Sequence, residues 1–217
     1  ACLARRRSGV RPPLTPLNFN IMNRKLEDYI YHKNNFLSKS YCDDLVHELN
    51  VAKWKYHEWY NVNTGDFFSV KHSPMTLKDS HGYTDITKKI DEAVNSITDR
   101  MRPVVIEYIK HLNFEWFTGW DGYTSIKLFQ YSPEQEMDSH WDNIRDIFDG
   151  ERKGVPIFSI VGALNNDYSG GEFIMFDDYK IEIKQGDVIL FPSTFLYPHK
   201  VSPVTEGIRY SYVSWGW

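Results

Sequence analysis

The feature that most constrains this chain is a series of short apolar runs that follows Gly122. Each run is rich in Val, Ile, Phe and Tyr, and turn-forming residues such as Asp177-Asp178 and Gln185-Gly186-Asp187 separate neighbouring runs. Short β-branched and aromatic segments between turn signals predict β-strands. The runs are TSIKLFQYS, VPIFSIVGAL, GEFIMF, YKIEIK, DVILFP and GIRYSYVSW. The C-terminal half is therefore predicted to form a β-sandwich or β-barrel.

Two stretches upstream show helical spacing instead. Ser40 is predicted to cap the first helix, and Thr84 or Asp85 the second, which Pro103 should end or kink. Residues 51–83 are aromatic and irregular, which indicates short strands and loops. Helices followed by strands predict an α+β chain. The apolar helix positions are Tyr41, Leu45, Val46 and Leu49, then Ile86, Ile90, Val94, Ile97 and Met101, with Val104, Tyr108 and Leu112 continuing beyond the proline.

Composition limits the organisation and the partners. The 217 residues suffice for one domain, expected over 19–217 after a basic, Pro-rich tail at 1–18. That tail has no apolar run after its arginines, so it is not interpreted as a secretory signal; an appended segment that is foreign to the protein remains an alternative. The formal charge of -4 argues against a nucleic-acid partner. No apolar run is long enough for a membrane span.

The cysteines bear on location. Only Cys2 and Cys42 occur, and Cys2 falls in the tail, so a stabilising disulfide is not expected. This favours a reducing environment, and a cytoplasmic location is predicted. The oligomeric state is not predicted.

Only one of the eight histidines, His140, begins a His-x-Asp triplet. In a strand, residues two apart point to the same face, so His140 and Asp142 would be presented together with Trp141 opposite. A third ligand from elsewhere would complete a 2-His-1-carboxylate facial triad, which leaves positions open on an iron ion. His199, directly after DVILFP and a short turn, is the candidate. Either histidine alone would be unremarkable.

Arg209 lies on the last apolar run, beyond His199. A cation buried on a strand is costly unless an anion meets it. A guanidinium can donate hydrogen bonds to both oxygens of a carboxylate, so Arg209 suits a dicarboxylate ligand such as 2-oxoglutarate. Ser211 shares the face of Arg209 and is a candidate second contact. The alternative for Arg209 is an ion pair on an edge strand.

These segments resemble a known family. FSIVGALNNDYSGGEF, GDVILFP and PHKVSPVTEGIRYSYVSW are similar to the prolyl 4-hydroxylase-like branch of the Fe(II)/2-oxoglutarate dioxygenases, as are FQYSPEQEMDSHWD and FLSKSYCDDLVHEL. The likeness runs from about residue 36 to the end, apart from residues 51–83. It implies a double-stranded β-helix (the jelly-roll, cupin-like core of that superfamily) over about 123–217, supported by N-terminal helices.

The resemblance also implies roles. His140, Asp142 and His199 would be the catalytic iron ligands, and Arg209 would bind the C5 carboxylate of 2-oxoglutarate. Tyr131 matches a tyrosine that contacts this co-substrate, with packing in the core as the alternative. Trp215 matches an aromatic residue near the co-substrate pocket, although packing alone would explain it. Fe(II), 2-oxoglutarate and O2 are the implied cofactors and co-substrates, with ascorbate as a candidate addition.

The expected activity is hydroxylation of an unactivated C–H bond, with decarboxylation of 2-oxoglutarate to succinate and CO2. The branch suggests a prolyl residue in a peptide or protein as substrate. The segment 143–154 is either a loop that folds over the substrate or an ordinary solvated loop. Hydroxylation of lysyl residues or free amino acids is the alternative. A non-enzymatic cupin-like module is disfavoured by the intact triad, and a nucleic-acid demethylase by the acidic charge and by Trp215 where a second arginine would be expected.

Overall fold

The computed structural model describes residues 23–60, 64, 66–69, 72–77, 87–114, 120–143 and 156–217. The predicted tail 1–18 and nearly all of the segment 143–154 lie outside these residues. The helices are η2 (Leu26–Tyr29), α1 (Lys39–Leu49) and α2 (Lys88–Leu112). The strands are β1 (Tyr31–Lys33), β2 (Lys55–Tyr56), β3 (Trp59–Tyr60), β4 (Phe67–Phe68), β5 (Met75–Thr76), β6 (Lys127–Tyr131), β7 (Met137–His140), β8 (Phe158–Ala163), β9 (Tyr168–Gly170), β10 (Phe173–Met175), β11 (Tyr179–Ile181), β12 (Val188–Pro192), β13 (His199–Val201), β14 (Val204–Gly207) and β15 (Arg209–Gly216).

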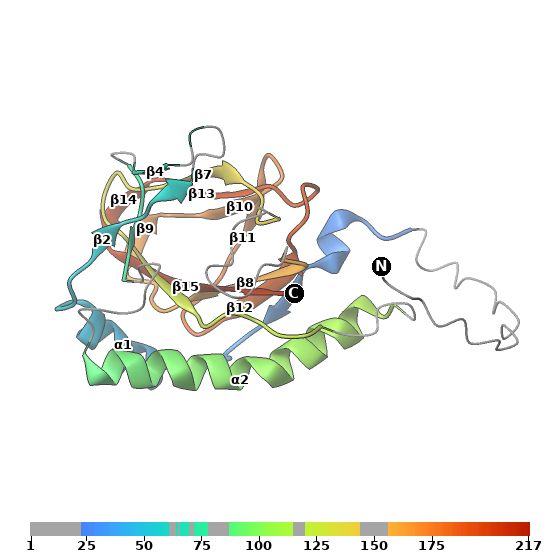
Figure 1. The fold of residues 1–217 in the computed structure, drawn as a ribbon, viewed down its shortest axis with the longest axis horizontal. Helices are drawn as coiled ribbons and strands as arrows, with labels where there is room; N and C mark the ends of the chain where they lie inside the picture. Colours follow the sequence, from blue (N-terminus) through green and yellow to red (C-terminus); the bar gives the residue numbers. More distant parts are fainter. Residues whose placement is uncertain are drawn as a thin grey trace, which may run out of the picture.

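Two antiparallel sheets face each other across the barrel. The larger has seven strands in the order β1-β12-β8-β15-β6-β5-β2, and the smaller has four in the order β11-β10-β13-β7. Helices α1 and α2 lie along the outer face of the larger sheet (Figure 1). This arrangement is the predicted double-stranded β-helix with its supporting helices. Every apolar run quoted from the sequence contains one of its strands.

The helix ends correct the sequence-based prediction. Helix α1 is capped by Ser38, whose side chain accepts from the backbone N–H of Tyr41, and not by Ser40. Helix α2 is capped by Thr87, which accepts from the N–H of Ile90, and not by Thr84 or Asp85. In both helices the capping hydroxyl belongs to the residue three positions before the backbone N–H that donates to it.

Helix α2 continues through Pro103. Figure 1 shows its axis changing direction along its length, as a helix does where a proline removes a backbone hydrogen bond. The helix ends at Leu112, and the next residue, Asn113, caps it in a left-handed conformation. The prediction that the apolar pattern carries on after the proline is confirmed, because Val104, Tyr108 and Leu112 are all buried.

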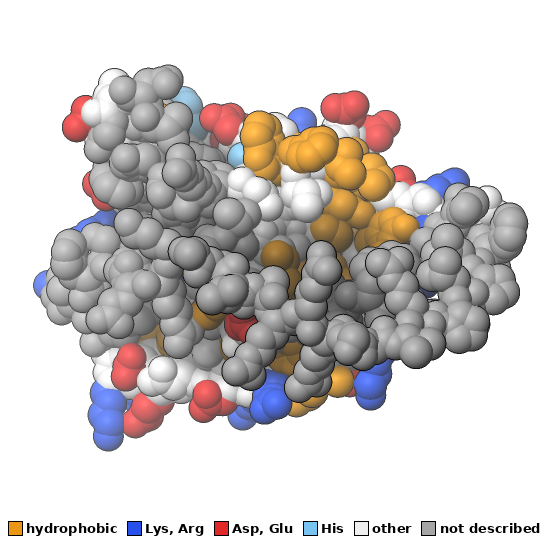
Figure 2. Space-filling model, turned by 45° about the vertical axis from the view of Figure 1, so that its right-hand side comes forward, with side chains coloured by type: hydrophobic (Ala, Val, Ile, Leu, Met, Phe, Trp, Pro, Cys, Tyr) orange, Lys and Arg blue, Asp and Glu red, His pale blue; other side chains and the backbone are white. Residues whose placement is uncertain are grey.

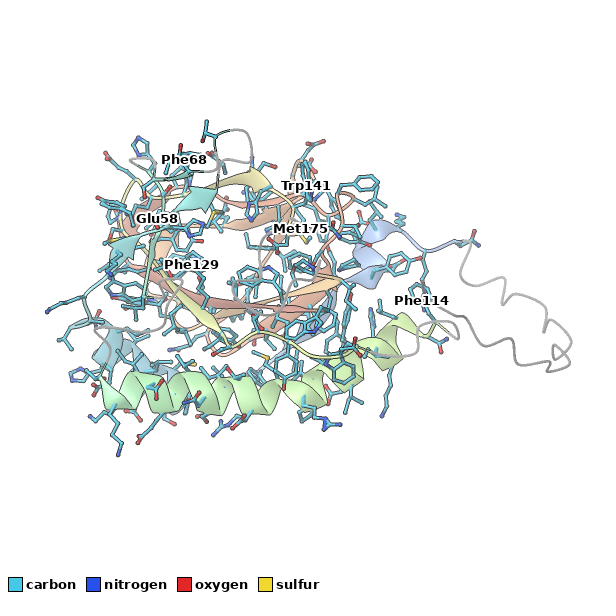
Figure 3. The ribbon with its side chains drawn as sticks, in the orientation of Figure 1. Glu58, Phe68, Phe114, Phe129, Trp141 and Met175 are labelled. Atoms are coloured by element: carbon cyan, nitrogen blue, oxygen red, sulfur yellow. The ribbon has the colours of Figure 1, made fainter. Side chains whose placement is uncertain are left out.

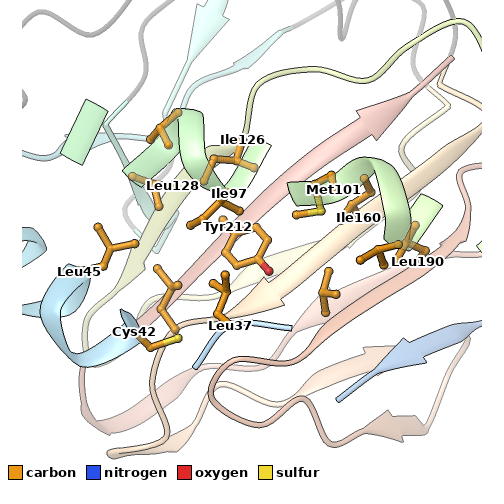
Figure 4. Packing of buried hydrophobic residues seen from close by; sticks show 14 of the residues in the cluster. Leu37, Cys42, Leu45, Ile97, Met101, Ile126, Leu128, Ile160, Leu190 and Tyr212 are labelled. Atoms are coloured by element: carbon orange, nitrogen blue, oxygen red, sulfur yellow. The ribbon is translucent and has the colours of Figure 1, made fainter. Parts of the chain in front are cut away.

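Alternation along the strands divides the apolar residues into two clusters. One cluster lies between the helices and the outer face of the larger sheet, and Figure 4 shows Ile97 of α2 close to Tyr212 and Leu128 of the sheet. The other cluster fills the barrel, with Phe129, Phe173 and others. Figure 3 places Phe129 and Met175 toward the inside of the barrel and Trp141 at its upper rim. The inner cluster surrounds the residues that the sequence singled out.

Candidate metal and carboxylate site

Three candidate ligands converge at one end of the smaller sheet. His140 is the last residue of β7 and His199 is the first of β13, and the two are paired across these strands. Their ring centres are 4.4 Å apart. His140 Nε2 lies 3.5 Å from Asp142 Oδ1, and His199 Nε2 lies 3.7 Å from Asp142 Oδ2. One donor atom from each residue lies within 4.8 Å of the others, which is close enough to share a metal ion.

Asp142 is not on the strand, contrary to the same-face prediction. Strand β7 ends at His140, and Asp142 lies in a bend two residues later, where it is 6% exposed. Trp141, between the two, is 48% exposed. The chain therefore does turn Trp141 outward and Asp142 inward, but by leaving the strand. Something other than the β-ladder must then hold the carboxylate in place.

Backbone carbonyls fix the tautomers of both histidines. Nδ1 of His140 lies 2.7 Å from the carbonyl oxygen of Asp138, and Nδ1 of His199 lies 3.1 Å from that of Tyr197. A carbonyl oxygen only accepts hydrogen bonds, so both Nδ1 atoms carry the hydrogen. In the neutral ring, each Nε2 then presents a lone pair toward Asp142. Such contacts commonly orient histidine ligands of metals.

The pKa values follow from burial and from these neighbours. Burial would raise the pKa of Asp142, but the adjacent histidines and the Ser159 hydroxyl hold it well below its usual range. Burial lowers the pKa of His199 to about 4. Burial would also lower the pKa of His140, but Asp142 and the Asp138 carbonyl raise it above its ordinary value. At neutral pH the site thus combines an ionised carboxylate with an imidazole, His199, that is already neutral.

Aromatic side chains enclose His199. Its ring stacks on Phe173 at 5.4 Å between centres and meets Phe191 nearly edge-on at 5.1 Å. His199 itself is 5% exposed. These rings keep water away from one side of the site, which strengthens electrostatic interactions within it.

Arg209 enters the same barrel from β15. It is 2% exposed, and its guanidinium carbon lies 4.9 Å from the centre of the Tyr131 ring on β6. Nη1 donates to Ser211 Oγ at 2.9 Å, whereas Nε has no hydrogen-bond partner among the described residues. No acidic side chain forms an ion pair with Arg209 in that part of the chain. A buried cation of this kind fits an anionic ligand.

The other candidates also face the inside of the barrel. Tyr131 is directly opposite Arg209 in the β6–β15 pair, and burial raises its pKa to about 12, so the phenol stays neutral. Trp215 is opposite Ser159 in the β8–β15 pair, and its indole Nε1 is buried without a partner among the described residues. The structure thus places all of the predicted site residues on the inside of the barrel.

The sequence did not point to Ser159 and Ser193. Both are buried, and Ser159 Oγ donates to Asp142 Oδ2 at 2.6 Å. The available signal was a serine inside the apolar run FSIVGA, where a polar side chain needs a partner. Pattern alone does not reveal that partner, because it lies across the barrel wall on another segment.

Comparison with known proteins agrees with this geometry. Residues 126–217, which carry every candidate residue named so far, match the model of the 2OG-Fe(II) oxygenase superfamily. The match covers the strands β6 to β15 and less than half of the whole chain. The chain resembles the prolyl hydroxylase-like members, as the sequence predicted.

Short segments are similar to bacterial PKHD-type hydroxylases. The chain is 46% identical over 62 residues to one from Psychrobacter sp., and 43% identical over 51 residues to one from Pseudomonas putida. These segments are 26% and 22% of this chain. They span only 23% and 22% of the two relatives.

Solved structures share the fold over most of the chain. A prolyl hydroxylase from Trichoplax adhaerens, in complex with a hypoxia inducible factor peptide fragment, has a TM-score of 0.63 at 19% identity and covers 88% of this chain and 84% of its own. A Pseudomonas putida prolyl-4-hydroxylase has a TM-score of 0.56 at 18% identity, over 87% of this chain and 91% of its own. At these identities the likeness concerns the fold.

Proposed function

We propose that this chain is an Fe(II)- and 2-oxoglutarate-dependent dioxygenase that hydroxylates a prolyl residue in a peptide or protein. The observation that carries the proposal is the coexistence, in one barrel, of a His-Asp-His cluster and a buried arginine with no acidic partner among the described residues. The first suits a divalent transition metal, and the second suits a carboxylate. A ligand that binds a metal at one end and carries a carboxylate at the other satisfies both.

Each residue then has a defined task. His140 and His199 would offer Nε2 lone pairs, and Asp142 would offer the negative charge. Arg209, hydrogen-bonded to Ser211 and in contact with the ring of Tyr131, would bind the distal carboxylate of 2-oxoglutarate. Bound iron and 2-oxoglutarate would together activate O2, with release of succinate and CO2 as a substrate C–H bond is hydroxylated. Phe173 and Phe191 keep water from one side of the metal ligands.

The surface beside the site supports a polypeptide substrate. Trp141, Phe195 and Leu196 are 48%, 71% and 49% exposed, and they flank the metal ligands and the turn before His199. Figure 2 shows apolar side chains gathered on the upper part of the molecule. Exposed apolar surface near a site commonly receives a binding partner. In the described residues, none of the helices combines the length and apolar character needed to span a bilayer.

The decisive assay measures succinate formation and O2 uptake together, with a proline- and lysine-containing peptide library analysed by mass spectrometry. We expect equal amounts of succinate and peptide that has gained one oxygen atom, located on proline. His140→Ala should form neither product. Oxygen on lysine, or only on free amino acids, would replace the prolyl assignment with the corresponding hydroxylase. Absence of 2-oxoglutarate turnover with every substrate would contradict the dioxygenase assignment.

A further inference from the structure

Two buried serines connect the metal-site carboxylate to the wall of the barrel. Strand β8 is buried along its whole length, and Ser159 is 0% exposed. Ser159 Oγ lies 2.6 Å from Asp142 Oδ2 and 2.7 Å from Ser193 Oγ. Ser193, which directly follows β12, is 1% exposed. The three side chains form one continuous hydrogen-bonded chain.

The direction of this chain follows from elementary chemistry. An ionised carboxylate only accepts, so the Ser159 hydroxyl must donate its one hydrogen to Asp142. The hydrogen between the two serines must then come from Ser193, which donates to Ser159. A hydrogen bond to a charged acceptor is roughly twice as strong as one between neutral groups. Polarisation by Ser193 strengthens the hydrogen bond from Ser159 to Asp142 further.

Ser193 also holds the backbone beside Asp142. The Ser193 carbonyl accepts from the Asn143 N–H at 2.9 Å, and the Ser193 N–H donates to the Ile157 carbonyl at 3.1 Å. Ser193 therefore contacts the Asp142 region through both its side chain and its main chain. The bond from the Asn143 N–H holds the backbone directly after Asp142, and the hydroxyl of Ser193 reaches the carboxylate through Ser159.

Asp142 needs this support because it lies beyond the end of β7, where no ladder fixes it. Its oxygens face different histidines, Oδ1 toward His140 and Oδ2 toward His199. Rotation of the carboxylate would change both distances at once. The bond from Ser159 to one of the two equivalent oxygens restrains that rotation.

We propose that Ser159, supported by Ser193, is a positioning residue that fixes the Asp142 carboxylate for metal binding. The proposal rests on the proposed function in one respect, that the His-Asp-His cluster binds a divalent metal. The prediction is that loss of the Ser159 hydroxyl weakens metal binding about 10- to 100-fold, the usual effect of removing such an outer contact. Loss of the Ser193 hydroxyl should weaken it less, because the bond from Ser159 to Asp142 remains.

The test is calorimetric titration of the metal-free protein with Co²⁺, together with the visible spectrum of the Co²⁺ complex. The variants are Ser159→Ala, Ser159→Thr and Ser193→Ala, with Ser214→Ala as a matched control. Ser214 is also a 0% exposed serine, on the neighbouring strand β15, and its hydroxyl donates to the Thr124 carbonyl at 2.7 Å. It therefore shows how losing a buried hydroxyl away from the metal site changes Co²⁺ binding.

We expect Ser159→Ala to weaken Co²⁺ binding and alter the spectrum, Ser159→Thr to retain both near the parent values, and Ser214→Ala to leave both unchanged. Parent-like affinity in Ser159→Ala, or an equal loss in Ser214→Ala, would overturn the proposal. If Ser159→Ala does not fold, Ser193→Ala is measured in its place. A Co²⁺ affinity of Ser193→Ala equal to that of Ser214→Ala would then overturn the proposal. If the parent protein binds no Co²⁺, the proposed function fails instead.

Discussion

The guanidinium of Arg209 lies against the ring of Tyr131, with 4.9 Å between the guanidinium carbon and the ring centre. The two residues are directly opposite each other in the β6–β15 pair, so the sheet itself sets their separation. Contact with an aromatic face lowers the cost of burying the cation but supplies no negative charge. The guanidinium remains available for a carboxylate, and this pair defines the inner end of the proposed co-substrate site.

Replacing Arg209 should therefore weaken the use of 2-oxoglutarate. Arg209→Ala removes a charge-assisted contact worth about 1.5–3 kcal/mol. The KM for 2-oxoglutarate should rise by about 10- to 150-fold. Arg209→Lys, which keeps the charge but not the two-pronged geometry, should lie between the parent and Arg209→Ala. Initial rates of succinate formation give the KM of each variant. An unchanged KM in Arg209→Ala would show that this residue does not belong to the site.

Tyr131→Phe separates a hydroxyl contact from packing. The variant keeps the ring against Arg209 and removes only the phenolic oxygen, which is neutral because burial raises its pKa to about 12. Loss of one neutral hydrogen bond costs about 0.5–1.5 kcal/mol. We expect the KM for 2-oxoglutarate to rise about 2- to 12-fold. The same assay, with thermal unfolding as a check of the fold, would assign Tyr131 to packing if KM stays at the parent value.

Metal affinity should depend on pH through His140. Its pKa is raised above the ordinary histidine value, so it stays protonated to a higher pH than a free imidazole, and a metal must displace that proton. His199, with a pKa of about 4, is neutral over the same range. Co²⁺ affinity should therefore fall as pH falls, by up to about tenfold per pH unit below the pKa of His140. Affinity that stays constant between about pH 6 and pH 8 would contradict this role of His140.

Packing between helix α2 and the larger sheet should affect the stability of the protein and not its metal binding. Ile97 on α2 is 0% exposed and packs in the outer cluster, so Ile97→Ala should reduce the free energy of unfolding by about 2–5 kcal/mol. Ile106 is on the same helix but 36% exposed, and Ile106→Ala should cost less than about 1 kcal/mol. Denaturant unfolding measures both. A Co²⁺ affinity that changes in Ile97→Ala would show that the two clusters are coupled.

The strands and the core of the site were predictable because both depend on local pattern. Apolar runs between turn signals located β6, β8, β10, β11, β12 and β15. His140 and Asp142 stood out by their His-x-Asp spacing, His199 by its place after the run DVILFP, and Arg209 as a cation within an apolar run. The helix caps were less predictable, since Ser38 and Ser40 are equally good caps by residue type. Only the backbone geometry selects Ser38.

What the pattern missed depends on contacts across the fold. Asp142 lies in a bend beyond the end of β7, and the β13–β7 pair has a register shift between His199 and Val201. Alternation along one strand reveals neither feature. Similarly, alternation places Ser159 on the inner face but does not identify its partner. The roles of His140, Asp142, His199, Arg209, Tyr131, Ser211 and Trp215, and the domain limits, remain predictions.

The most direct test of the central claim is a titration of 2-oxoglutarate into the protein under anaerobic conditions, with and without Fe(II). Because one ligand must reach both the metal and Arg209, we expect one molecule bound per chain, with much tighter binding when Fe(II) is present. Both Asp142→Ala and Arg209→Ala should weaken that binding. Equal binding of 2-oxoglutarate without the metal, or unchanged affinity in both variants, would contradict a site shared by the metal and Arg209.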